Sequence, residues 1–392
     1  MSSIFRLSTV WIVTALVPLA FACAGSDDAR PANEDAGDST SPDGTSASVS
    51  NEDAGVDAAP VRECSDDGFC HTAVPEGQTL RAVWGDGQGV VWAVSGQGAI
   101  LRWEGSEWTI HASGLGPLSA IWGSGPTDVW VGGASVLFHG TGSSPDTLTF
   151  APTQRPRGDV TSIWGASASD VWAVAISYQD EPRSRVLHYA PGVGGTAAWS
   201  EVAVTEDPSE VLFTHVWGTA ASGVWLGGTV GGPWTPGRLY RRPQGASEFD
   251  PVLAPSDPEM PAEPYDPGEL MSVSVISDTR MVLLARTLAG DETLVHATTT
   301  DGGQTFTLDR AELGEFNGLW SYAVAGTADD LWVAGEYGRM RRWNGSAWTA
   351  STLSVTKYPV ISDFFAFWVK APNDLWVVGD GIALHLDPTR KK

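Results

Sequence analysis

The chain has 392 residues, of which 47 are acidic and 23 basic, so its net charge is −24. Such an excess of negative charge repels phosphate backbones, and nucleic acid is therefore excluded as an expected partner. A basic protein, a glycan or a divalent cation suits this field better.

Residues 1–22 have the pattern of a secretory signal peptide, in which Arg6 precedes a short apolar run. That run is too short to span a bilayer comfortably. The following residues, LAFAC, resemble the cleavage box of bacterial lipoproteins, whose cysteine becomes the lipidated first residue. The resemblance implies an extracytoplasmic protein that is held to the membrane only by a lipid on Cys23, and Ala24 points to the outer membrane. Ordinary secretion with an unpaired Cys23 is the alternative.

Residues 23–63 contain the lipidation candidate and then a stretch rich in Asp, Ser, Ala, Gly and Pro with almost no large apolar side chain. This stretch cannot bury enough apolar surface to offset the entropy of ordering it. Its like charges favour extended conformations. We therefore predict a disordered acidic linker that acts as a tether.

Cys64 and Cys70 are the other two cysteines of the chain. In an exported protein, a pair at this spacing favours a disulfide that closes a small loop. A zinc site would need two more ligands, and only His71 lies nearby. We predict the disulfide, and neither a metal site nor a cofactor.

From residue 64 to 392 the chain repeats a pair of large apolar residues that stand eight positions apart. The pairs are Trp84/Trp92, Trp122/Trp130, Trp164/Trp172, Trp217/Trp225, the degraded Val275/Leu283, Val324/Trp332 and Trp368/Trp376. A period of roughly 40 to 50 residues built from short strands is typical of a β-propeller. The sequence thus predicts an all-β fold, a seven-bladed propeller of four-stranded antiparallel blades.

The first unit shows the four strands of a blade, beginning with LRAVWG at residues 80–85 and ending with EWTIHAS at residues 107–113. The last unit supplies only three strands. Residues 70–75 align with the fourth strand of unit one. We therefore expect this N-terminal strand to complete the seventh blade and close the ring, which removes an open sheet edge.

Two family resemblances accompany the repeat. The segment TTDGGQTF (residues 299–306) resembles the Asp-box hairpin of sialidase-like and photosystem assembly-factor propellers, where the aspartate caps the turn and the aromatic ring enters the core. The segments ILRWEGSEW (100–108) and MRRWNGSAW (340–348) resemble units of tectonin-type lectin propellers. The second resemblance implies carbohydrate binding.

Every unit carries a basic or imidazole side chain in its third strand. The positions are Arg102, His139, His188, Arg241, His296, Arg342 and His385. Because equivalent positions lie on different blades, they cannot converge on one metal ion, and we expect each to pack on a Trp with its polar tip bonded to a turn. Four aspartates precede the second Trp of their units, and we expect them to bond turn backbone: Asp128, Asp170, Asp330 and Asp374.

Catalytic motifs are not found in the sequence: we recognise no nucleophile elbow, HExxH, phosphate loop or sialidase arginine set. We assign no catalytic residue. The alternative function is a glycan-processing enzyme on a sialidase-like propeller, which would require an acid pair and arginines converging in the central channel.

Units three to five have longer connections between their second and third strands and between blades. In a propeller these two classes of loop open on the same face, and insertions on one face usually carry binding. The candidate ligand contacts are Tyr178, Asp180, Glu181, Asp207, Trp234, Glu263, Tyr265 and Asp266. We expect a monomeric, non-catalytic module that binds a glycan or an extracytoplasmic protein through this face.

Overall fold

The computed structural model describes residues 63–192, 194–232, 235–254, 263–313, 319–355 and 358–389. These all belong to the second of the two units into which the chain divides, Ala58–Lys392. The predicted signal peptide, Cys23 and the linker up to residue 62 lie outside the described residues. No helix in the described ranges is long and apolar enough to cross a membrane.

Seven four-stranded antiparallel sheets form the blades of a propeller, which confirms the predicted fold. Blades 1 and 2 contain β2 (Leu80–Gly85), β3 (Val91–Ser95), β4 (Ile100–Trp103), β5 (Trp108–Ala112), β6 (Leu118–Gly125), β7 (Asp128–Gly133), β8 (Val136–Thr141) and β9 (Thr149–Gln154). Blades 3 and 4 contain β10 (Asp159–Ser167), β11 (Asp170–Ile176), β12 (Ser184–Pro191), β13 (Ala197–Val202), β14 (Val211–Thr219), β15 (Gly223–Val230), β16 (Gly237–Arg242) and β17 (Asp250–Pro251).

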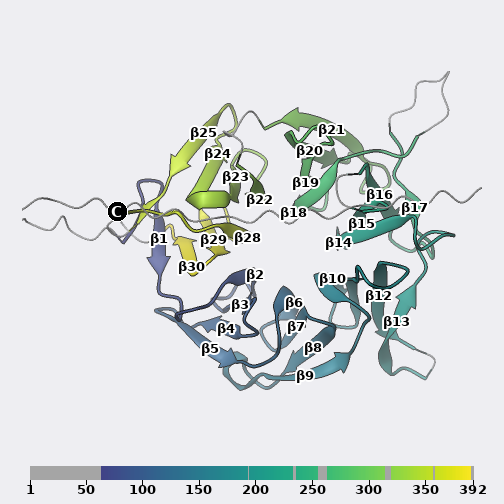
Figure 1. The fold of residues 1–392 in the computed structure, drawn as a ribbon, viewed down its shortest axis with the longest axis horizontal. Helices are drawn as coiled ribbons and strands as arrows, with labels where there is room; N and C mark the ends of the chain where they lie inside the picture. Colours follow the sequence, from purple (N-terminus) through teal and green to yellow (C-terminus); the bar gives the residue numbers. More distant parts are fainter. Residues whose placement is uncertain are drawn as a thin grey trace, which may run out of the picture. The chain divides into compact units, whose positions relative to one another are not determined.

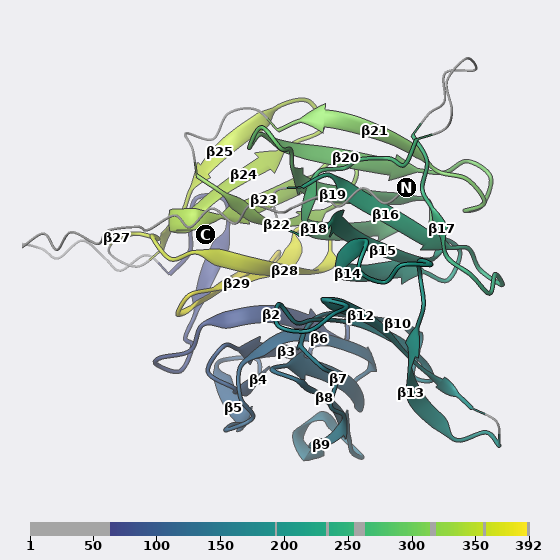
Figure 2. The same cartoon turned by 45° about the vertical axis from the view of Figure 1, so that its right-hand side comes forward.

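The other blades follow the same order. Blades 5 and 6 contain β18 (Glu269–Ser277), β19 (Arg280–Arg286), β20 (Glu292–Thr298), β21 (Thr307–Glu312), β22 (Ser321–Gly326), β23 (Leu331–Gly335), β24 (Arg339–Trp343) and β25 (Trp348–Thr352). Blade 7 contains β28 (Phe364–Ala371), β29 (Asp374–Gly379), β30 (Ile382–Leu386) and β1 (Phe69–Thr72). The connections hold the short helices η1 (Pro145–Thr147) and η2 (Glu336–Gly338) and the hairpin of β26 (Ser354–Val355) and β27 (Tyr358–Pro359). Figures 1 and 2 show the blades around a centre lined by the first strand of each.

The ring closes through the N-terminal strand, as predicted. β1 pairs antiparallel with β30, and Cys70 lies opposite His385. The Thr72 hydroxyl donates to the carbonyl of Ala383 at 2.8 Å and accepts the indole N–H of Trp108 at 3.1 Å, which ties blade 7 to blade 1. The predicted disulfide links Cys64, which precedes β1, to Cys70 within β1.

The first Trp of a unit packs on a glycine of the next blade, and this contact explains the repeated Trp-Gly dipeptide. A Cβ atom at Gly123 would lie 2.6 Å from the Trp84 ring, and one at Gly165 would lie 2.5 Å from the Trp122 ring. Any larger residue would displace the indole from a close-packed interior. Each glycine therefore makes room for the tryptophan of the preceding blade.

Two of the degraded repeat units are shifted by one residue from their predicted alignment. In blade 5, Ser274 pairs with Val282, which in turn pairs with His296, so these residues and not Val275 and Leu283 occupy the Trp positions. In blade 6, Ala325 and not Val324 pairs with Trp332, because the turn between the two strands is one residue shorter. Without aromatic rings to mark the register, the apolar pattern fitted the wrong alternation.

Candidate functional site

One of the two faces of the ring, here called the loop face, holds the connections between second and third strands and the connections between blades. Because all strand pairs within the blades are antiparallel, these two kinds of connection open on the same face. Five of the seven exposed large apolar side chains among the described residues lie in them: Tyr178, Leu253, Leu288, Tyr337 and Ile361.

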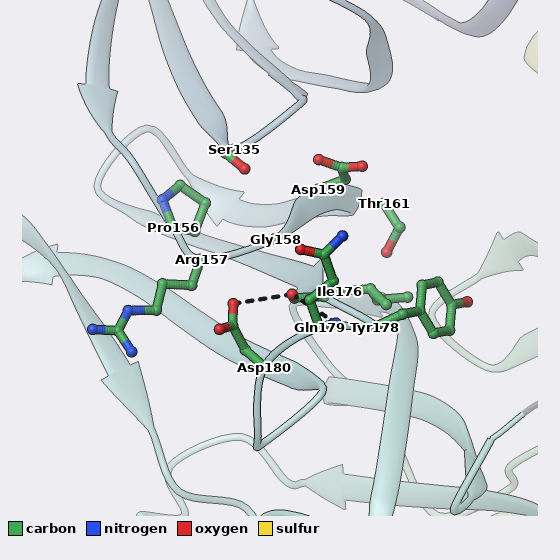
Figure 3. Close-up of a pocket in the computed structure, with 11 residues that line it drawn as sticks. Ser135, Pro156, Arg157, Gly158, Asp159, Thr161, Ile176, Tyr178, Gln179 and Asp180 are labelled. Atoms are coloured by element: carbon green, nitrogen blue, oxygen red, sulfur yellow. Dashed lines mark hydrogen bonds between the residues drawn. The ribbon is translucent and has the colours of Figure 1, made fainter.

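A pocket of about 650 Å³ opens on the loop face between blades 2 and 3. Its walls come from the β7–β8 turn, the connection from β9 to β10 and the loop between β11 and β12. The lining includes Ser135, Pro156, Arg157, Gly158, Asp159, Thr161, Ile176, Ser177, Tyr178, Gln179 and Asp180. Figure 3 shows Arg157 on one side of this pocket and Tyr178 with Thr161 on the other.

A buried arginine and close backbone packing hold the backbone around the pocket in position. The buried Arg185 guanidinium donates to the carbonyl of Arg157 at 3.1 Å. Gly158 has φ +107°, and a Cβ atom there would lie 2.4 Å from the carbonyl oxygen of Ile176, so only glycine lets the chain approach the end of β11. Ser135 occupies the left-handed region at φ 54°, which a residue with a Cβ adopts at a cost in energy.

The charged and amide side chains of the pocket divide into one, Asp180, that is oriented and three that are available. Asp180 accepts the Ser177 hydroxyl at 3.0 Å, and the same hydroxyl accepts the N–H of Gln179, as the dashed lines in Figure 3 mark. The guanidinium of Arg157, the carboxylate of Asp159 and the amide group of Gln179 bond to no other described residue. The pocket therefore offers both donors and acceptors beside the Tyr178 ring, which is 70% exposed.

Of the seven predicted ligand contacts that lie among the described residues, only Tyr178 and Asp180 line this pocket. Glu181 lies in the same loop, where it forms an ion pair of 3.6 Å with Arg183. Asp207 lies in the connection from blade 3 to blade 4, and hydrogen bonds from Ser209 lower the pKa of its carboxyl group. Its carboxylate therefore stabilises its own turn.

The three candidates between blades 4 and 5 form no exposed cluster with Tyr178. Tyr265 is buried against the core of blades 4 and 5, because its backbone pairs with Val252 and turns the ring inward, so it cannot serve as the predicted surface contact. Asp266 accepts the N–H groups of Gly237 and Gly268 at 2.6 and 2.9 Å, which is a turn-forming role. Glu263 is exposed. Trp234 lies outside the described residues.

Sequence reasoning missed Arg157, Asp159 and Gln179. A signal was present in the segment RPRGD (residues 155–159), where two arginines stand close together in an acidic chain beside a Pro and a Gly. The segment joins two blades without extra length, so loop length does not mark it as a binding site.

The central channel, with a volume of about 270 Å³, is uncharged along its described lining. Its two titratable side chains are His215 and Tyr322. Desolvation lowers the pKa of His215 to about 4, and desolvation followed by the hydrogen bond to Glu336 raises the pKa of Tyr322 to about 12, so both are neutral near pH 7. The described lining residues include neither the acid pair nor the arginines that the sialidase-like alternative requires.

Thr161 lines both the channel and the pocket, so the pocket adjoins the mouth of the channel. Its hydroxyl donates to the carbonyl of Thr214 at 2.9 Å in the next blade. A ligand in the pocket would therefore contact a residue that links blade 3 to blade 4.

Three of the four repeated imidazoles, His139, His188 and His385, lie on the second Trp of their own blades, as predicted, whereas His296 pairs with Val282 in blade 5, which has no Trp there. His188 stacks on Trp172 with ring centroids 3.8 Å apart, and His385 stacks on Trp376 at 4.2 Å. The imidazole tip bonds to the repeated aspartate, as in the 2.8 Å contact of His188 with Asp170. The prediction that these aspartates bond turn backbone is therefore wrong, because the register places each one within reach of the basic or imidazole side chain of the third strand.

Asp301 caps the hairpin between β20 and β21 of blade 5. Its carboxylate accepts the hydroxyl and N–H of Thr305, the hydroxyl of Thr299 and the N–H of Gln304, and these bonds hold its pKa well below the usual value. Phe306 follows and packs edge-on against Trp225 with centroids 5.1 Å apart. This hairpin is a structural element. No group of three metal-ligating side chains occurs among the described residues.

The sequence matches no protein-family model and no curated protein. Solved structures resemble it in fold. YCF48 bound to D1 peptide has 13% identity and a TM-score of 0.57, with 83% of this chain and 98% of that chain covered. Virginiamycin B lyase from Staphylococcus aureus has 10% identity and a TM-score of 0.57, with coverages of 80% and 96%.

A third similar structure is the extracellular domain of the putative one component system BT4673 from B. thetaiotaomicron. It has 11% identity and a TM-score of 0.56, with 81% of this chain and 40% of that chain covered. At such identities the likeness establishes the fold and leaves the ligand open. The chain is a seven-bladed β-propeller whose structural neighbours include binding proteins and a lyase.

Proposed function

We propose that this protein is an exported, membrane-tethered, non-catalytic module that binds a glycan through the pocket between blades 2 and 3. The observation that carries the proposal is the exposed Tyr178 ring beside polar groups that no described residue satisfies. A pyranose ring has an apolar C–H face that stacks on an aromatic ring, and its hydroxyl groups both donate and accept hydrogen bonds.

The lining provides partners for both parts of a sugar. Asp159 and Asp180 are acceptors for hydroxyl groups, Gln179 is both donor and acceptor, and Arg157 donates to oxygen atoms. The pocket volume of about 650 Å³ suits a short oligosaccharide segment. The neutral channel beside it supplies no charged group for hydrolysis among its described residues.

Export and tethering are supported by the sequence before residue 64 and by the disulfide. Cysteine pairs of this kind persist in oxidising compartments outside the cytoplasm, and Cys64 is bonded to Cys70. Lipidation at Cys23 and an outer-membrane location complete the proposal. We expect the folded unit to be a monomer.

The test is a glycan array probed with the purified protein, followed by calorimetry on the strongest hit. The Tyr178→Ala variant should weaken that hit at least tenfold. Tyr337→Asn is the matched control, because it removes another exposed tyrosine ring from the same face, 62% exposed against 70% for Tyr178, and Asn tolerates the left-handed backbone there. Absence of any saturable hit, with a correctly folded sample, would overturn the glycan proposal.

Metabolic labelling with a radioactive fatty acid tests the anchor. Wild-type protein should be labelled and should sediment with membranes, whereas Cys23→Ser should remain unlabelled and soluble after export. Labelling that persists in Cys23→Ser would remove the proposed anchor.

A further inference from the structure

We propose that the loop face carries a second recognition site, for a protein partner, formed by Tyr337 and Ile361 where blades 6 and 7 meet. The proposal rests on residues outside the pocket of blades 2 and 3 and does not depend on glycan binding. Single exposed apolar residues are ordinary on protein surfaces. These two side chains are 62% and 75% exposed and lie on adjoining segments.

Tyr337 is held in a conformation that its own side chain disfavours. Its φ and ψ are 54° and 38°, in the left-handed region that non-glycine residues seldom occupy. Strain of this kind persists only where the surroundings fix it, and it concentrates at functional sites. Here the strained residue presents an aromatic ring to solvent.

The surrounding contacts fix the segment firmly. The Glu336 carboxylate accepts the N–H of Trp320 at 3.0 Å and the hydroxyl of Tyr322 at 2.8 Å. The N–H of Tyr337 donates to Asp363 at 2.9 Å. Because its backbone is already ordered, the Tyr337 ring can be buried by a partner with little further loss of backbone entropy.

The segments of Ile361 and Tyr337 touch through the residues next to them in the chain, Val360 and Gly338. A Cβ atom at Gly338 would lie 2.0 Å from the carbonyl oxygen of Val360, so the two backbones touch there. Asp363, which binds the Tyr337 N–H, lies two residues beyond Ile361. The two exposed side chains therefore flank one contact between the segments and form a preordered apolar pair.

The charges around this pair define the chemistry of the partner. Glu336 precedes Tyr337, and Asp363 lies two residues after Ile361. Arg339 is the basic residue of the Tyr337 segment, and the carboxylate of Asp380 accepts the hydroxyl of Thr79 at 2.7 Å. On the channel side, the Arg81 guanidinium lies over the Phe365 ring at 4.3 Å. The two carboxylates of Glu336 and Asp363 beside an aromatic ring favour an apolar side chain flanked by Lys or Arg, since a cation can also lie over the Tyr337 ring.

The same charges argue against other occupants. A second copy of this chain would bring the same carboxylates and a net charge of −24 into contact. Anionic lipid headgroups would be repelled by the carboxylates as well. A basic, apolar protein segment is the occupant that satisfies both the ring and the charges.

The probe is a set of fluorescent twelve-residue peptides in which a central Leu, Phe or Trp is flanked by Lys and Arg. Matched peptides carry Glu in place of the basic residues or Ser in place of the central apolar residue. Anisotropy should show binding of the basic apolar peptides only, weakened by added salt. Tyr337→Asn should weaken it at least tenfold, and Asn tolerates the left-handed backbone, so this variant keeps the fold.

Ile361→Ser should weaken binding of the same peptides, whereas Tyr178→Ala should leave it unchanged. Equal binding of all peptide sets, or insensitivity to both Tyr337→Asn and Ile361→Ser, would overturn the proposal. Binding to phosphatidylglycerol vesicles that Tyr337→Asn abolishes would replace it with a membrane contact. Loss of peptide binding in Tyr178→Ala alone would return the function to the first pocket.

Discussion

Similar polar side chains have different roles on the two faces of the ring: on one they bond to each other, and on the other they are free to bind a ligand. On the face with the turns between first and second strands, aspartates such as Asp170 bond to imidazoles of the same blade. At the loop face, Arg157, Asp159 and Gln179 bond to no other described residue, and Tyr178 and Tyr337 expose their rings. The first arrangement stabilises the fold, and the second leaves interactions available to a ligand.

On the face opposite the loop face, where the turns between first and second strands lie, substitutions should reduce stability more, because the side chains there contact the buried Trp residues. Trp172 is fully buried and donates its indole N–H to Asp170 at 2.9 Å. The exposed residues of the loop face have no comparable contact. Substitutions should therefore separate the two faces into one that governs stability and one that governs binding.

The largest effect is expected from Gly165→Val, which places a side chain where a Cβ alone would lie 2.5 Å from the Trp122 ring and 2.9 Å from the carbonyl oxygen of Asp170. Overpacking of this kind costs about 3 kcal/mol of unfolding free energy. Urea unfolding followed by Trp fluorescence measures it. Gly125→Val is the control, since a Cβ atom at Gly125 meets nothing within 4 Å. Equal losses in both variants would refute the Trp-Gly explanation of the repeat.

A smaller loss is expected from Asp170→Ala. The substitution removes acceptors from His188 and from the buried Trp172 indole, and an unsatisfied buried donor costs about 1 to 3 kcal/mol. Chemical denaturation should show this loss, whereas Asp278→Ala, at the corresponding turn of blade 5, should change stability by less than about 0.5 kcal/mol. A neutral Asp170→Ala would show that the bonds of Asp170 to His188 and Trp172 add nothing to the stability of the fold.

Lowering the pH should reduce the stability of the fold through the buried imidazole of His215. Its folded-state pKa of about 4 lies below the ordinary value of 6.5, so the unfolded chain binds the proton first as the pH falls. Stability is therefore highest above pH 6.5 and decreases toward pH 4, by about 1 kcal/mol at pH 5.5 from this group. Unfolding curves between pH 7.5 and 4.5 should show the decrease, and His215→Asn should flatten it. An unchanged slope in that variant would assign the effect to other groups.

Below pH 4 a second loss follows from the carboxyl groups. The hydrogen bond from His188 is the main reason that the pKa of Asp170 is below its usual value, and Asp301 is lowered by its Thr305 and Thr299 bonds. Stability from these groups is present above their unfolded pKa values and is lost as the pH falls through the folded ones.

The smallest effect on stability is expected from Tyr178→Ala and Tyr337→Asn. Both rings are mostly exposed, so each variant should unfold within about 0.5 kcal/mol of the wild type. Thermal unfolding measures this directly. A large loss in either variant would mean that the ring packs on the fold, and reduced ligand binding could then no longer be assigned to a lost contact.

The sequence predicted the fold well because its structural signals repeat. The Trp pairs at a fixed spacing, the missing fourth strand and the cysteine pair each favoured one structure, and these predictions are confirmed. The predicted strand register is wrong only in blades 5 and 6, where Ser274 and Ala325 occupy the position of the first Trp. There, neither residue size nor spacing distinguished one alternation from the other.

The candidate site was less predictable because it depends on which loops meet in space. Tyr178 and Asp180 were found from the length of their loop, whereas Arg157 comes from a connection of ordinary length. The sequence predicts Tyr265 as a surface contact because it stands in a long connection between blades, yet backbone pairing with Val252 directs it into the core. Tyr337 lies in a short turn whose strained backbone has no signature in the sequence.

The disulfide in the closing strand has a mechanical consequence. Tension applied to the chain before Glu63 passes from Cys64 across the sulfur bridge to Cys70, so residues 65–69 are bypassed. The force then enters the ring through the pairing of Cys70 with His385 and is resisted by the ladder between β1 and β30. In a propeller held by its N-terminus, the strand that closes the ring would therefore also carry the load of the tether.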